Sequence, residues 1–226
     1  MTIFKDILAT NEFYHIYNKT VGDEQVFDNK YNLNRAIDLV DFYRFKVPYS
    51  FSKYKDFPIK LRQEALEKIR KLPSLVEIYS FSFMPNHFHF LLKQVQDNGI
   101  NYFITNFQNA FARFYNLRSE RKGAVFCHSF DRVRIEQEEQ FIHVSRYIHL
   151  NPVTAYLIKM TDLPNYPYTS FMDYCENRKL FFLNKDIILN YFKNKEKYSA
   201  FVSNQEDYQK KLDKIKRLKI DEMRNI

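Results

Sequence analysis

The sequence predicts an α+β fold, in which one antiparallel sheet carries helices on one face in a ferredoxin-like or RRM-like topology. Segments with strand and helix patterns follow in the order strand, helices, strand, strand, helix, strand, helix. Two of the strand segments are separated only by a tight turn, which favours an antiparallel hairpin. No internal repeat and no Gly/Ser- or Pro-rich linker divides the chain.

The first part of the chain begins with a strand and continues with helices. Glu12–Lys19 is rich in aromatic residues and partly alternates, which predicts a strand. Asn32–Phe45 repeats apolar residues at helical spacing, and Asn32 is a suitable cap for its start. Lys46–Phe57 is aromatic and irregular, which predicts a loop. Ile59–Leu72 has amphipathic spacing and predicts a second helix, ended by the proline that follows it.

The middle of the chain contains the predicted hairpin and the longest predicted helix. Leu75–Ser82 and His87–Val95 predict two strands, joined by a turn at Met84-Pro85-Asn86. Asn101–Leu117 places phenylalanine and alanine residues on a period of 3.6 residues, which predicts a helix. An extended run from Val125 to Ile135 predicts the fourth strand.

The last part of the chain is predicted to be helical. Glu136–Leu150 begins with acidic residues, which suit the positive end of a helix dipole, and Asn151-Pro152 predicts its end. The remainder is predicted to form a basic extension with short helices over Lys185–Phe192, Lys195–Val202 and Glu206–Met223.

The composition is that of a folded chain from a reducing compartment. Of the 226 residues, 45% are hydrophobic and 27% are charged, which excludes long low-complexity disorder. No stretch approaches the roughly 18 uncharged apolar residues of a membrane span, and the start lacks the apolar run of a signal peptide. The two cysteines exclude a disulfide framework and a four-sulfur zinc site, so a cytoplasmic location is expected.

The charge balance points to a polyanionic partner. Lysine and arginine outnumber aspartate and glutamate by 35 to 27, which gives a net charge of +8. The aromatic share of 18%, with 17 Tyr and 23 Phe, is compatible with surfaces that stack on bases. Codon drift in an AT-rich genome favours the same residues, so the composition suggests nucleic acid without establishing it.

The predicted second strand of the hairpin carries two histidines. Side chains of a strand alternate, so His87 and His89 share one face, roughly 7 Å apart. Two imidazoles in this arrangement can hold a divalent metal or a phosphate. Two surface histidines on a half-buried strand would give the same pattern.

A stripe of polar residues lies along one face of the last predicted helix of the domain. His143, Tyr147 and Asn151 are four residues apart and therefore share one helix face. A phenol on this stripe could act as a nucleophile if a metal or a cation helped it to ionise, because its ordinary pKa is about 10. A half-buried structural tyrosine has the same spacing, so the spacing alone leaves the function open.

Two segments considered together resemble the single-tyrosine transposases of the HUH superfamily, and in particular the REP-associated tyrosine transposases. The segments are FMPNHFHFLL over residues 83–92 and YIHLNPV over residues 147–153. Further agreement lies at Tyr14–Lys19, Val26-Phe27, Tyr115-Asn116 and Tyr168-Thr169-Ser170. The resemblance covers roughly residues 10–175, and the HFH and YIHLNP motifs are specific in combination.

The resemblance implies a catalytic domain over residues 1–155, built on the HUH endonuclease sheet, and a helical, basic extension over 156–226. It implies a metal-dependent endonuclease and strand transferase that cuts single-stranded DNA near hairpins, such as REP-like elements or insertion-sequence ends. Cleavage in this family passes through a 5′-phosphotyrosine. Relatives act as homodimers or monomers, and the sequence does not choose between the two.

The family's functional residues fall on four positions of this sequence. His87 and His89 correspond to the histidines that bind Mg²⁺ or Mn²⁺, and Tyr147 corresponds to the nucleophile. Asn151 corresponds to a third metal ligand, although its place before a proline also suits a helix cap.

Candidate DNA contacts are basic residues interleaved with Phe and Tyr. Residues 101–135 contain six basic and two acidic side chains, a mixture suited to phosphate contact and base stacking. The candidates are Lys19, Arg113, Arg118, Arg121, Lys122, Arg132 and Arg134.

Three alternatives share parts of this pattern. A non-catalytic DNA hairpin-binding protein would retain the HUH fold without its chemistry. A replication initiator or relaxase often has a second tyrosine four residues from the first, but here position 143 is a histidine. An RNA-binding RRM module would carry an aromatic RNP strand pattern, which this sequence lacks.

Overall fold

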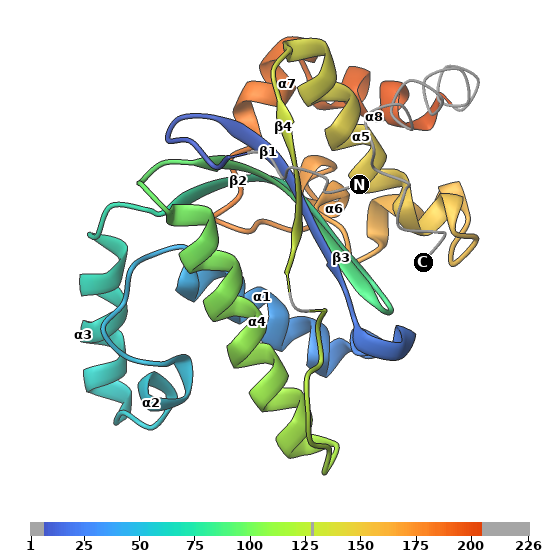
Figure 1. Cartoon of the computed structure of the whole chain (residues 1–226). Coiled ribbons are helices and arrows are strands. Elements are labelled where there is room, and N and C mark those ends of the chain that lie inside the picture. Colours follow the sequence, from blue (N-terminus) through green and yellow to red (C-terminus); the bar gives the residue numbers. More distant parts are fainter. Residues whose placement is uncertain (1–6, 128, 205–226) are drawn as a thin grey trace.

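The computed structural model describes residues 7–127 and 129–204, and a four-stranded antiparallel sheet forms its centre (Figure 1). β1 (Phe13–Lys19) lies inside the sheet, between β3 (His87–Gln94) and β4 (Asp131–Ile135). β2 (Val76–Met84) forms a hairpin with β3 and occupies one edge, so the strand order is β2-β3-β1-β4. The predicted α+β class and ferredoxin-like sheet are confirmed.

The first face of the sheet is covered by α1 (Lys30–Tyr43) and α4 (Gly99–Arg118), which lie on the same side of it in Figure 1. The short α2 (Phe51–Lys55) and α3 (Ile59–Arg70) follow α1. Phenylalanines of β2, β3 and α4 fill this core, and many of their rings meet edge to face. Much of the aromatic composition therefore serves the core and not a base-stacking surface.

The opposite face is also covered, which corrects the expectation of helices on one face only. α5 (Glu138–Thr154) packs against β2 and β3 on this side. A second hydrophobic core surrounds it and includes side chains of the C-terminal elements. These elements are η2 (Met160–Asn165), α6 (Phe171–Tyr174), α7 (Asp186–Phe192) and α8 (Lys195–Ser203). Among the residues described, no helix is long and apolar enough to cross a membrane.

Two predicted boundaries in the first part of the chain were wrong. α1 is capped by Asn29, whose side-chain oxygen accepts the backbone N–H of Asn32 at 2.9 Å, so the helix begins before the predicted cap. Asn32 is buried instead and donates its amide to the carbonyl of Val26. The predicted loop over 46–57 contains α2, because Ser50 caps a short helical turn that buries two aromatic rings. The predicted helix Glu206–Met223 lies outside the described residues.

α5 continues through Asn151 and Pro152, where its end was predicted. Pro152 cannot donate a backbone hydrogen bond, but it lies in the last turn, where the loss is a single bond. Thr154 and Ala155 donate to the carbonyl of Asn151, which completes the turn. Asn151 and Pro152 are both buried, and this packing outweighs the local bias of a residue before proline.

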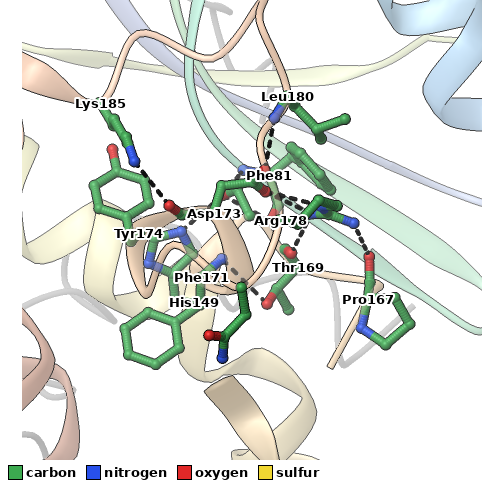
Figure 2. A network of polar contacts seen from close by, with 12 residues as sticks. Phe81, His149, Pro167, Thr169, Phe171, Asp173, Tyr174, Arg178, Leu180 and Lys185 are labelled. Atoms are coloured by element: carbon green, nitrogen blue, oxygen red, sulfur yellow. Dashed lines mark hydrogen bonds and ion pairs between the residues drawn. The ribbon is translucent and has the colours of Figure 1, made fainter. Parts of the chain in front are cut away.

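The segment after α5 bonds to β2 through Ser170 and Tyr168, and a buried ion pair, shown in Figure 2, holds the segment itself together. The carboxylate of Asp173 accepts two bonds from Arg178, at 2.6 and 3.0 Å, and one from the backbone N–H of Leu180 at 2.9 Å. Arg178 also donates to the carbonyls of Pro167 and Thr169, each at 2.7 Å. Because Asp173 is only 2% exposed, its charge depends on these partners.

We therefore expect Asp173→Ala to lower the free energy of unfolding by about 3 to 5 kcal/mol, since it leaves the guanidinium of Arg178 largely buried without its carboxylate. Chemical denaturation measures this change. The control is Asp97→Ala, which removes an exposed carboxylate and should shift stability by less than about 0.5 kcal/mol. Equal effects of the two variants would contradict the role of the ion pair.

Candidate active site

The face of the sheet beneath α5 carries the candidate active site. Successive side chains of β1 and β3 alternate between the faces, so His15 and Tyr17 share the side of His87 and His89. The register places Tyr17 directly opposite His89. The neighbours of these residues, such as Ile16 and Phe88, lie in the core on the other side.

His87 stands at the start of β3, beside the hairpin turn. Its ring meets that of His89 nearly edge-on, with centroids 5.1 Å apart. Nδ1 of His87 lies 2.7 Å from the side-chain oxygen of Asn86, which can only accept, so Nδ1 carries the proton. The lone pair of neutral His87 is then on Nε2, the form in which an imidazole binds a metal.

Backbone and side-chain contacts fix the turn that holds this histidine. The N–H of Thr20 donates to the carbonyl of Asn86 at 2.8 Å, and the N–H of Phe27 donates to that of Pro85 at 3.1 Å. The amide of Asn86 donates to Asp23, in the short η1 (Val21–Asp23), which fixes the orientation of its oxygen toward the histidine.

Tyr147 projects from α5 onto the histidines of its own chain. Its ring lies edge-on to both His15 and His89, with centroids 5.8 Å away in each case. Tyr147 is 9% exposed, so its ring is held by packing. Sequence segments 58 residues apart, β3 and the middle of α5, thus bring the two predicted motifs together.

Asn151 lies one helical turn beyond Tyr147 on the same face of α5. It is 7% exposed, and its Nδ2 has no hydrogen-bond partner among the described residues. This nitrogen can donate a hydrogen bond to a bound ligand such as a phosphate oxygen, whereas only the Oδ1 atom of Asn151 could bind a metal.

The donor set fits a divalent metal ion. No cluster of three or more His, Cys, Asp or Glu residues suited to a metal occurs in the described part of the chain. His87 and His89 on β3 each offer a ring nitrogen to the metal, and the side-chain oxygen of Asn151 on α5 offers a third ligand atom. Such a partial set leaves coordination positions for water and substrate oxygens, as Mg²⁺ and Mn²⁺ sites with phosphate substrates require.

The seven candidate DNA contacts lie in different places. Lys19 is directly opposite His87 in the β1–β3 register, on the face of the candidate site. Arg132 and Arg134 pair with Ile16 and Tyr14 and therefore point to the other face. Arg134 also forms an ion pair with Glu12.

The remaining four candidates belong to α4 and the loop after it. Arg121 is held by Glu24 at 2.8 Å and donates to Asn116 and to the carbonyl of Ala124, contacts that anchor this loop. Lys122 next to it is exposed. Arg113 and Arg118 line a groove of about 600 Å³ between α1, α2 and α4, together with Arg35 and Lys55. This groove is on the first face, so the sheet separates it from Tyr147.

A buried polar network anchors α5 to the C-terminal elements. His149, fully buried, lies 2.7 Å from the hydroxyl of Ser170 through Nε2 and 2.8 Å from that of Tyr198 through Nδ1. The hydroxyl of Tyr198 also contacts that of Ser145 at 3.1 Å. The network fixes the helix two residues beyond Tyr147 and so positions the nucleophile candidate.

We expect this network to make the fold sensitive to acid. Burial lowers the pKa of His149 from 6.5 to about 3, so the folded protein keeps it neutral while the unfolded chain takes up a proton below pH 6.5. Stability is therefore lost as the pH falls from 6.5 toward 3, by about 2 kcal/mol at pH 5 from this residue. Urea denaturation at pH 7, 6 and 5 measures the slope. His149→Gln should reduce this slope, although buried His15 and His89 still contribute to it, and an unchanged slope would contradict this cause.

Sequence reasoning missed His15 and Tyr17 as residues of the site. Their rings lie 5.1 and 5.7 Å from that of His89. The alternation of β1 placed both on one face, but which face of β3 they would meet depended on the register, which no local pattern specifies.

Comparisons with known proteins identify related sequences and folds. Residues 53–151 match the family model described as "Transposase IS200 like", and this range includes both histidines, Tyr147 and Asn151. No curated protein sequence matches the chain. Among solved structures, a REP-associated tyrosine transposase bound to a REP hairpin aligns with 83% of this chain and 93% of that chain, with a TM-score of 0.53 and 15% identity. A protein of Deinococcus radiodurans R1 described as a candidate transposase aligns with 66% of this chain and 95% of that chain, with a TM-score of 0.36 and 16% identity.

Proposed function

We propose that this chain, of which residues 53–151 match the IS200-like transposase family model, is a metal-dependent endonuclease and strand transferase for single-stranded DNA. The observation that carries this proposal is the packing of Tyr147 against His89 and His15, beside His87. In this arrangement the phenol of Tyr147 would be the nucleophile, and the imidazoles of His87 and His89 on the same face of the sheet would bind the metal beside it.

His87, His89 and Asn151 would hold the metal, Mg²⁺ or Mn²⁺. When bound, the metal polarises the scissile phosphate and stabilises the negative charge that develops on it. The two imidazoles are neutral ligands, so they leave the full charge of the cation available to the phosphate. Burial beneath α5 limits the access of water to the site.

Tyr147 would perform the covalent step. Its phenol oxygen gives up its proton to water and attacks the phosphorus, the bond from phosphorus to the 3′ oxygen breaks, and that oxygen takes up a proton from water and leaves as a 3′-hydroxyl. The product is a 5′-phosphotyrosine. The new bond conserves the energy of the phosphodiester, so the 3′-hydroxyl of a second strand can reverse the step without ATP.

Basic side chains would hold the DNA on two surfaces. Lys19, which lies directly opposite His87, would contact a phosphate at the candidate site. Arg113 and Arg118, with the other cations of the groove on the first face, would contact more distant phosphates. The solved structure with this fold contains a REP hairpin, and we extend that class of partner, single-stranded DNA with a hairpin, to this protein.

A cleavage assay tests the function. The protein is incubated with hairpin-containing single strands labelled at either the 5′ or the 3′ end, in Mn²⁺ or in EDTA. We expect a protein-linked product that retains only the 3′ label, because the tyrosine keeps the 5′ phosphate of the downstream fragment, and we expect EDTA to abolish it. Specific hairpin binding without cleavage would instead indicate a non-catalytic hairpin-binding protein.

A further inference from the structure

His15, on β1, forms a direct hydrogen bond with the metal-ligand candidate His89. Nε2 of His15 lies 3.0 Å from Nδ1 of His89, and the rings are stacked, with centroids 5.1 Å apart and planes 15° apart. Both rings are buried, at 0% and 6% exposure, and the burial disfavours a charge on either of them. One proton therefore lies between the two nitrogens.

That proton has two possible positions, with different consequences for the metal. If His15 donates, His89 carries its own proton on Nε2, and neither of its nitrogens is available to a metal. If His89 donates from Nδ1, its Nε2 keeps a bare lone pair. Because Nδ1 is occupied by His15 in both cases, only the second arrangement makes His89 a ligand.

We propose that His15 is a positioning residue that accepts the Nδ1 proton of His89 and so presents the bare Nε2 of His89 to the metal. This inference rests on the proposed function, because it assumes that His89 binds a metal. A hydrogen bond to the outer nitrogen commonly fixes the tautomer and the ring orientation of a metal-binding histidine.

One observation supports the tautomer, and a second supports a role for His15 other than packing. His87 has the same arrangement, since its Nδ1 donates to the oxygen of Asn86, so both candidate ligands have an acceptor at Nδ1. In this assignment His15 carries its own proton on Nδ1, which is buried and has no hydrogen-bond partner among the described residues, so the fold retains this imidazole at a cost in stability. An apolar side chain would fill this position without that cost, so the imidazole serves a purpose other than packing.

Two variants of His15 separate the hydrogen bond from the packing. His15→Phe keeps an aromatic ring but removes the acceptor. His15→Gln places an amide oxygen near the position of Nε2, where it can accept the same proton. We expect the Kd of the metal-free protein for Mn²⁺ to rise about 10- to 100-fold in His15→Phe and to return to within about threefold of wild type in His15→Gln.

Imidazole ¹⁵N spectra of protein labelled at histidine give a readout that does not depend on activity. With diamagnetic Mg²⁺ bound, we expect His89 to be protonated at Nδ1, and we expect the Nε2 resonance to shift on titration with Mg²⁺. Thermal denaturation of both variants reports any effect on folding separately from metal affinity.

The outcomes are distinguishable. If wild type binds Mn²⁺ and His15→Phe binds it equally well, the inference is overturned while the proposed function stands. The same holds if His89 keeps its proton on Nε2 in the Mg²⁺-bound protein, or if both variants lose affinity equally. If wild type binds neither Mn²⁺ nor Mg²⁺, the inference and the metal dependence of the proposed function both fail.

Discussion

Tyr147→Phe is expected to abolish cleavage of hairpin DNA, with a loss on the order of 10⁴-fold or more in the rate of covalent adduct formation. The variant removes one oxygen, the atom that would attack the phosphorus, and keeps the ring that packs against His15 and His89. Hairpin binding and Mn²⁺ affinity should stay close to wild type, because the phenol contributes to neither in the proposed account. Single-turnover cleavage and filter binding measure the two effects separately.

The chain offers two informative controls for this substitution. Tyr156→Phe makes the same change at a tyrosine that is 95% exposed and should leave cleavage unchanged. Tyr17→Phe tests the competing nucleophile, since the ring of Tyr17 also lies near that of His89, at 5.7 Å. Cleavage that persists in Tyr147→Phe and disappears in Tyr17→Phe would identify Tyr17 as the nucleophile.

Loss of a metal-binding histidine is expected to have the second largest effect. His89→Ala should weaken Mn²⁺ binding strongly and reduce cleavage about 10³-fold, which corresponds to about 4 kcal/mol of lost charge stabilisation. His87→Ala should act in the same direction, and because His87 is only partly buried, this variant carries a smaller risk of misfolding. Isothermal titration measures the affinity for Mn²⁺, and single-turnover cleavage measures the rate.

The pattern across variants distinguishes a metal ligand from a structural residue. His143→Ala removes a histidine of α5 that packs against Phe201, and it should leave Mn²⁺ affinity unchanged. Tyr147→Phe should lose cleavage and keep the metal, whereas His89→Ala should lose both. Cleavage by His89→Ala at the wild-type rate would contradict the proposed site.

The sequence predicted the sheet and the family because these depend on local patterns. Alternation defined β1 and β3, the Met-Pro-Asn turn defined the hairpin, and the aromatic period defined α4. The resemblance to transposases came from two motifs, and residues 53–151, which contain the first motif and residues 147–151 of the second, match the family model described as "Transposase IS200 like".

The features that the sequence did not predict depend on tertiary contacts. α5 continues through Pro152 because burial of the helix end outweighs a local bias. The opposite face of the sheet is covered because the elements after residue 160 bury their apolar side chains around α5. These contacts join residues far apart in the sequence, so local sequence patterns do not predict them. Amphipathic spacing also shows that a helix has a buried face but not which side of a sheet it meets.

The candidate site was predicted in part for the same reasons. The alternation of β3 placed His87 and His89 together, and the family motif identified Tyr147 and Asn151. His15 was missed because its meeting with His89 depends on the β1–β3 register. The register also directs Arg132 and Arg134, two of the candidate DNA contacts, to the face opposite the tyrosine, which their basic character alone did not indicate.

The most direct test of the account is to identify the residue that becomes linked to DNA. The wild-type protein would be reacted with a hairpin oligonucleotide in Mn²⁺, digested with a protease and a nuclease, and its modified peptide sequenced by mass spectrometry. The account predicts a 5′-linked nucleotide on Tyr147, within the peptide that contains YIHLNP. A nucleotide on Tyr17 or another residue, or cleavage that leaves a free 5′-phosphate and no modified peptide, would contradict it.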